Sequence, residues 1–170
     1  MRLYGTKAPN IAHEITASLL SSGDIEAEAP KEVEADVLSV LNQYVSQEKD
    51  VSDRTRELLE RTGRGPGEFN RVRNQVAESS GIKVGDEALD YLLDQVVAIF
   101  HHSANVDEIY VEDVELRRKM RPIFKKYMAA DADLDGEVRA QLKHVTEGTR
   151  TWDIEYARVM EQIKRKRGLA

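Results

Sequence analysis

The chain has 170 residues, of which 41% are apolar and 33% are charged, and its formal net charge is −6. This length suits one ordinary domain or two small ones. It contains no cysteine, which excludes a disulfide scaffold and a metal site built on thiolates. Aromatic residues make up only 6%, and few aromatics beside many charges favour amphipathic helices over a β-barrel or β-sandwich.

The hydropathy of the sequence bears on the cellular compartment in which we expect the protein. No apolar run approaches the roughly 18 residues of a membrane-spanning helix, and the first residues lack the apolar stretch of a signal peptide. We therefore expect a cytoplasmic protein with no membrane partner.

The first half of the chain has the apolar period of α-helices. It predicts four helices: residues 11–19, residues 33–45, a short helix marked by Leu58 and Leu59, and residues 69–76. Pro30 suits the first turn of the second helix, and Gly81 ends the fourth. The second half repeats this plan, with helices at residues 89–100, 116–128, 138–145 and 152–163. Pro122 predicts a kink or a late start in the second of these.

Two short stretches, residues 24–27 and 108–111, occupy similar places in the two halves and alternate in polarity. They are expected to be brief extended segments, and pairing with each other is one arrangement open to them.

The chain also repeats itself. Residues 41–80 and 124–163 align without a gap at a constant offset of 83. The identical pairs are Tyr44/Tyr127, Asp50/Asp133, Arg56/Arg139, Leu59/Leu142, Gly65/Gly148, Val76/Val159 and Glu78/Glu161. The fold predicted from this is all-α, a tandem duplication of a small four-helix unit packed about a pseudo-two-fold axis. Its N-terminal repeat spans residues 1–83 and its C-terminal repeat residues 84–170.

Asp131, Asp133 and Asp135 precede Gly136, which is the spacing of the first half of a helix-loop-helix calcium site. The last ligand position of such a loop requires a glutamate side chain and is filled by Leu142, which has no side-chain oxygen. The segment is therefore only a weak metal candidate, and the alternative is a polar loop that caps the next helix.

Two basic groups lie in the second half. One is the run of Lys164, Arg165, Lys166 and Arg167, and the other is centred on Arg117 and Arg118, with Lys119, Arg121, Lys125 and Lys126. Such groups either contact phosphates or complement the negative end of a helix dipole. Together they predict a basic face on the second half, opposed by an acidic run between residues 26 and 36.

Trp152 and Tyr156 are four residues apart and share a helix face, so they either pack against the preceding helix or form an exposed interaction anchor. Asp153 lies beside them in the first turn, where it complements the helix dipole.

Motifs of catalysis are missing from the sequence. There is no Gly-x-Ser-x-Gly elbow and no cysteine nucleophile, and the adjacent His101 and His102 cannot chelate one ion from one helix face. The glycine-rich residues 63–67 lack the ending of a phosphate loop and are interpreted as a helix cap and a turn. We predict no catalytic residue, no cofactor and no enzymatic activity.

The chain resembles the bacterial domain-of-unknown-function family numbered 507. The resemblance is carried by Met1-Arg2-Leu3, the segment from Glu137 to Leu142, residues 150–156 and the closing residues 164–169, and it covers the whole chain. It implies a helical fold, and no catalytic residue can be carried over from it.

The function expected from the sequence is that of a protein-interaction or scaffold module working through its second half, as a monomer or homodimer with an unidentified protein partner. The alternative is a nucleic-acid or ribosome-associated protein that binds through the basic face, and salt dependence of binding distinguishes the two.

Overall fold

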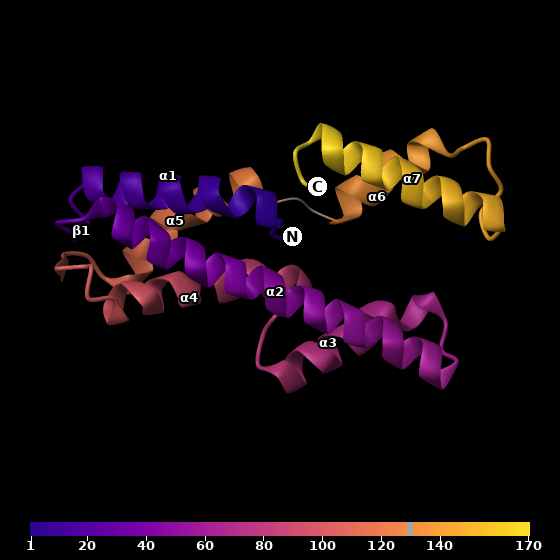
Figure 1. The fold of residues 1–170 in the computed structure, drawn as a ribbon, viewed down its shortest axis with the longest axis horizontal. Coiled ribbons are helices and arrows are strands. Elements are labelled where there is room, and N and C mark those ends of the chain that lie inside the picture. The colour runs from indigo at the N-terminus through magenta and orange to yellow at the C-terminus, as the bar shows by residue number, and fades with distance from the viewer. Residues whose placement is uncertain (129–130) are drawn as a thin grey trace.

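The computed structural model describes residues 1–128 and 131–170, without the side chains of residues 131 and 132 (Figure 1). These residues form seven α-helices and two short strands, which confirms the all-α prediction. The helices are α1 (Ala8–Ser21), α2 (Pro30–Thr62), α3 (Phe69–Ser80), α4 (Ala88–His102), α5 (Asp113–Tyr127), α6 (Asp131–Gln141) and α7 (Arg150–Lys166). The strands are β1 (Ile25–Glu26) and β2 (Glu108–Ile109). Short 3-10 turns span Gly5–Lys7, Pro66–Glu68 and Gly85–Glu87.

The helix count of the first half differs from the prediction, because α2 runs for 33 residues where two helices were expected. Its buried stripe continues through polar residues, among them Glu48 and Thr55. Glu48 is paired with Arg2 Nε at 2.9 Å, and Thr55 donates to the carbonyl of Val51 at 2.7 Å. Since these polar groups have partners, they can occupy core positions, and the gap they leave in the apolar pattern is not a break in the helix.

The two strands pair with each other, which confirms one of the arrangements open to them. They are antiparallel, with Ile25 opposite Ile109 and Glu26 opposite Glu108. Backbone hydrogen bonds extend the contact, since the N–H of Tyr110 donates to the carbonyl of Asp24 at 2.8 Å. The first and second halves of the chain are therefore joined at this end of the molecule.

The largest apolar cluster is built mainly from α1, α2, α4 and α5. Helix α1 packs against α2 and α5, while α4 packs against α5 and α2. Fully buried side chains such as Ile11, Leu41, Leu92 and Phe124 show that both halves contribute to it. Residues on the two sides of the predicted boundary at residues 83 and 84 therefore share one core.

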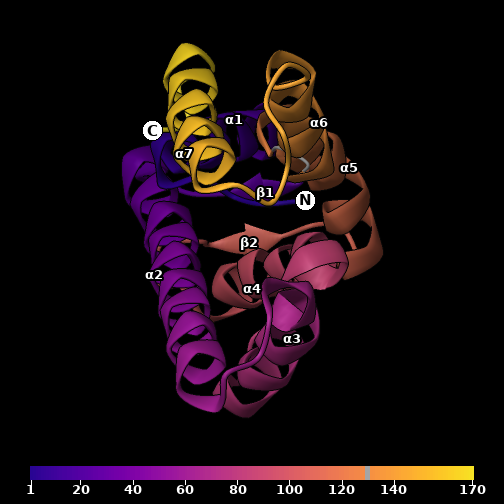
Figure 2. The same cartoon turned by 90° about the vertical axis from the view of Figure 1, so that its right-hand side faces the viewer.

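Helices α6 and α7 form a second, smaller cluster. Its buried residues are Leu134, Val138, Leu142, Val159 and Ile163, joined by Tyr4 and Leu169. Figures 1 and 2 show this pair at the upper edge of the molecule and α3 at the lower edge. A hydrogen bond from the Thr6 hydroxyl to the carbonyl of Gly168, 2.6 Å long, ties the pair to the 3-10 turn that precedes α1.

None of the helices in the described part of the chain combines the length and apolar character needed to cross a membrane.

Candidate functional site

Helix α5 carries the first of the predicted basic groups. It has six lysines and arginines against two carboxylates, a formal charge of +4. Its residues at steps of three and four share one side of the helix and line a surface hollow of about 460 Å³. We call this set the α5 stripe: Val114, Arg117, Arg118, Arg121, Pro122 and Lys125. The helix begins at Asp113 and contains Pro122, so the late start considered from the sequence is wrong.

Each arginine of the stripe has a carboxylate partner within the molecule. Arg117 Nε lies 2.7 Å from Asp94, and Arg121 Nη2 lies 2.6 Å from Asp90, both on α4. Arg118 pairs along its own helix with Glu115 at 2.8 Å, and its guanidinium lowers the pKa of that carboxyl. A guanidinium has five N–H donors in a fixed plane, so one carboxylate leaves donors that can face solvent.

The stripe also contains two apolar residues, Val114 and Pro122. Val114 is 66% exposed, and Pro122 is exposed one turn from Arg118. Arginines around exposed apolar groups are typical of protein interfaces, where the stems of the arginines add apolar area and their ends add hydrogen bonds.

The remaining cations of this basic group, Lys119 and Lys126, form ion pairs that hold α5 to residues of the first half. Lys119 Nζ lies 2.5 Å from Asp24 Oδ2, and the Ser22 hydroxyl donates to the same oxygen. Burial opposes the ionisation of Asp24, but these two hydrogen bonds outweigh it and hold the pKa of the carboxyl below its ordinary value. At the C-terminal end of α5, Tyr127 and Lys126 donate to Glu14 and lower its pKa in the same way.

The tryptophan segment lies on the α6–α7 pair. The rings of Trp152 and Tyr156 are stacked with centroids 5.0 Å apart, and the Arg139 guanidinium lies over the Trp152 ring at 5.3 Å. Both aromatic side chains are half-buried, and the Tyr156 hydroxyl donates to Asp135 at 2.6 Å. Asp153 is exposed in the first turn of α7. The aromatic pair thus packs within the hairpin, with part of its surface open.

The basic residues at the end of α7 do not act as one group, because they contact different partners. Lys164 lies over the Tyr4 ring at 5.4 Å, Arg165 pairs with Glu161 at 2.6 Å, and Arg167 pairs with Glu137. Lys166 is exposed. The structure brings Arg167 and Lys126 to one hollow of about 390 Å³, away from the residues that line the α5 stripe.

The expected polar loop at residues 131–136 is wrong, because these residues form the start of α6. In a helix, residues two positions apart are rotated by about 200° around the axis and point to opposite sides. Asp133 and Asp135 therefore cannot coordinate one ion together as the ligands of a calcium loop do. The Asp135 carboxylate accepts hydrogen bonds from Tyr156 and Arg139, which lower its pKa. The Asp131 side chain lies outside the described residues, and those described contain no cluster of three or more histidines and carboxylates able to hold a metal.

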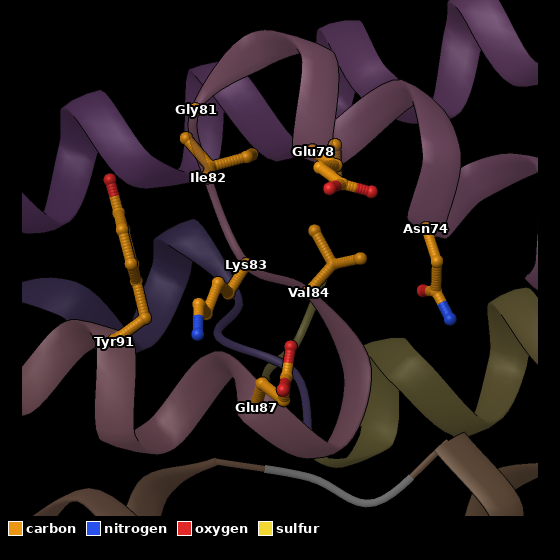
Figure 3. Close-up of a pocket in the computed structure, with 9 residues that line it drawn as sticks. Asn74, Glu78, Gly81, Ile82, Lys83, Val84, Glu87 and Tyr91 are labelled. Atoms are coloured by element: carbon orange, nitrogen blue, oxygen red, sulfur yellow. The ribbon is translucent and has the colours of Figure 1, made fainter.

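A cavity that sequence reasoning missed lies between the end of α3 and the start of α4 (Figure 3). Its volume is about 450 Å³. The lining side chains shown in Figure 3 come from α3 (Asn74, Glu78), from the connection after it (Ile82, Lys83, Val84 and Glu87, the last in a 3-10 turn) and from α4 (Tyr91). The only signal in the sequence is the apolar pair Ile82 and Val84 directly after a helix-ending glycine.

Two comparisons bear on the identity of the chain. The model of the family described as "Protein of unknown function (DUF507)" matches residues 1–169. A search of curated proteins found no match.

Proposed function

Since the chain belongs to the DUF507 family, as its motifs indicated, and the family description assigns no activity, we propose a function from the surface itself. The protein is a non-enzymatic interaction module of the cytoplasm that binds a protein partner through the α5 stripe. The observation that carries this proposal is the 66% exposure of Val114 within a hollow lined by arginines.

The pairing of the arginines supports a protein partner over a nucleic acid. Asp90 and Asp94 lie beside the stripe and would repel a phosphate backbone as they attract Arg121 and Arg117. Phosphate binding draws on unpaired cations, whereas a protein partner gains from the exposed Val114 and Pro122 and from the directed N–H groups of the arginines beside them. The acidic side chains near the stripe also hold the arginines in place before a partner arrives, which lowers the entropy cost of binding.

The shifted pKa values support a non-enzymatic role. The carboxyls whose pKa is lowered include Glu14, Asp24, Glu115 and Asp135. Each shift has a cause in a hydrogen bond from a neighbouring tyrosine, serine, lysine or arginine that holds two elements or one helical turn together. Their perturbation is thus explained by structural pairing rather than by a catalytic task.

The tandem duplication remains part of this proposal. Helices α2 and α5 begin at Pro30 and Asp113, and strands β1 and β2 begin at Ile25 and Glu108, an offset of 83 in both cases. Adding 83 to one partner of the ladder pair Ile25–Ile109 and subtracting it from the other produces the second pair, Glu108–Glu26. An antiparallel ladder between two copies related by a two-fold axis has this property. Fusion of two copies would fix the geometry of a dimer and leave one copy free to acquire a partner.

Photo-crosslinking from the stripe tests the proposal. A photoreactive residue at position 114 should capture one defined protein from nuclease-treated lysate. The same residue at position 154, where Ile154 is 57% exposed on α7, should not. With the purified partner, V114D should weaken binding by at least about tenfold, while the matched control I154D should leave it unchanged.

Two outcomes would contradict the proposal. Equal capture from positions 114 and 154 would show that the stripe has no special role. Capture that disappears with nuclease, together with binding that falls steeply between low and physiological salt, would favour the nucleic-acid alternative.

A further inference from the structure

The cavity between α3 and α4 has an apolar floor. Ala77, Ile82 and Val84 form it and are all buried, with exposed fractions of 2%, 3% and 7%. The half-buried ring of Tyr91 stands at one end, and Figure 3 shows Asn74 at the other. The Tyr44 hydroxyl donates to the carbonyl of Lys83 at 2.9 Å, so the connection that supplies the floor is held against α2. The cavity is therefore a formed feature of the fold.

The rim of this cavity is charged and predominantly acidic. Figure 3 shows Glu78 entering from α3 and Glu87 from the opposite side, with Val84 between them. Both glutamates are exposed, and no ion pair among the described residues engages either of them. Among the described residues that line the cavity, Lys83 is the one cation, so their formal charge is −1.

These features together select a class of ligand. An apolar floor accepts a chain of methylene groups, and carboxylates at the rim accept hydrogen bonds from an ammonium group. The face of Tyr91 offers a further site for a cation. A volume of about 450 Å³ lies within the range of small-molecule sites, roughly 300–1,000 Å³. We infer that this cavity binds an aliphatic chain that ends in an ammonium group.

Two other ligand classes fit less well. An anion would face Glu78 and Glu87 across the opening and be repelled. A purely apolar ligand would cover the floor but would remove water from the two carboxylates without giving them a partner, which is costly. A linear diamine and the side chain of a partner's lysine share the favoured chemistry, so the experiment includes both.

Titration of the isotope-labelled full-length protein, followed by NMR, tests the inference with three probes. These are 1,4-diaminobutane, Nα-acetyl-lysine amide and, as an uncharged analogue, butan-1-ol. We expect the two amines to shift the amide signals of Ile82 and Val84 and to bind at least about tenfold more tightly than the alcohol, since each charge-assisted hydrogen bond is worth about one order of magnitude. The amine that binds more tightly identifies the source, a free polyamine-like compound or a basic side chain.

Variants separate the cavity from general charge effects. E78Q/E87Q should weaken amine binding by about tenfold or more, and each single substitution should have part of that effect. The matched control E57Q/E60Q removes the same charge from two exposed glutamates of α2 outside the cavity lining and should change binding by less than about twofold. Because all four side chains are exposed, the variants should fold, which their thermal unfolding curves verify.

Three results would overturn the inference: equal affinity for the alcohol and the amines, equal weakening by the control variant, or no shift at Ile82 and Val84 with either amine at tens of millimolar. Each result can be told apart from a failure of the proposed function, which concerns α5 and is measured at position 114.

Discussion

Replacing Lys119 with methionine should destabilise the fold, because it leaves the Asp24 carboxylate buried without its cationic partner. The two side chains are 29% and 6% exposed, and their charged atoms lie 2.5 Å apart. Removing one partner of a charge-assisted hydrogen bond at so buried a carboxylate costs about 2–3 kcal/mol. Methionine keeps most of the aliphatic length of lysine, so the packing of the stem is retained. In urea, with a slope of roughly 2 kcal/mol per molar, the unfolding midpoint at pH 7 should fall by about 1 M.

The penalty should depend on pH in a direction set by the lowered pKa of Asp24. A carboxyl whose pKa is lower in the folded than in the unfolded state stabilises the fold above its unfolded pKa, and this contribution is lost as pH falls through the folded pKa. The stability difference between wild type and K119M should therefore be full at pH 7 and shrink as the pH falls below about 4, near the ordinary pKa of aspartate.

The matched control is K125M, the same substitution on the same helix at an exposed lysine for which the described residues show no ion pair. It should change the free energy of unfolding by less than about 0.5 kcal/mol. The double variant D24N/K119M should cost less than the sum of its single variants, because both remove the same interaction. A K119M penalty below about 0.5 kcal/mol, or one independent of pH, would refute the reasoning.

Three further predictions concern other parts of the fold. Leu92→Ala removes a fully buried side chain from the shared core and should lower the free energy of unfolding by about 2–5 kcal/mol; a loss under 1 kcal/mol in urea titration would be inconsistent with its burial. Gly63→Ala places a Cβ at a φ of +66° after α2 and should cost about 1–2 kcal/mol, whereas Gly67→Ala, at a glycine without positive φ, should cost less in the same thermal unfolding assay. Tyr156→Phe removes the hydrogen bond to Asp135 and should raise the pKa of that carboxyl toward its ordinary value, as measured by NMR titration of its carboxyl carbon; an unchanged pKa would contradict the assigned cause.

Helix α2 shows a limit of predicting helix boundaries from the apolar periodicity of the sequence. The expected break near residues 46–57 rested on a gap in the apolar pattern, yet Glu48 and Thr55 hold buried positions in an unbroken helix. Glu48 is accepted there because Arg2, far away in the sequence, reaches it. A local pattern cannot reveal a partner that arrives from another part of the chain.

In the candidate site too, local sequence reveals which residues are present but not which distant residues they contact. The sequence shows the two basic groups of the second half, and the basic face predicted from them stays a prediction. What it could not show is that Arg117 and Arg121 are paired with Asp94 and Asp90 of α4. These pairs leave Val114 as the most exposed apolar feature of the stripe, which is why we propose the protein partner expected from the sequence rather than the nucleic-acid alternative.

By itself, the sequence determined the helical class of the fold, the two short strands and the family to which the chain belongs, because helical periodicity and sequence motifs are local properties. The tertiary structure alone decided that α1, α2, α4 and α5 share one core, that residues 131–136 are helical rather than a loop, and that Glu78 and Glu87 face each other across a cavity. These features depend on which side chains meet after folding. Contacts between residues far apart in the chain are set by the packing of whole helices, which no single segment encodes.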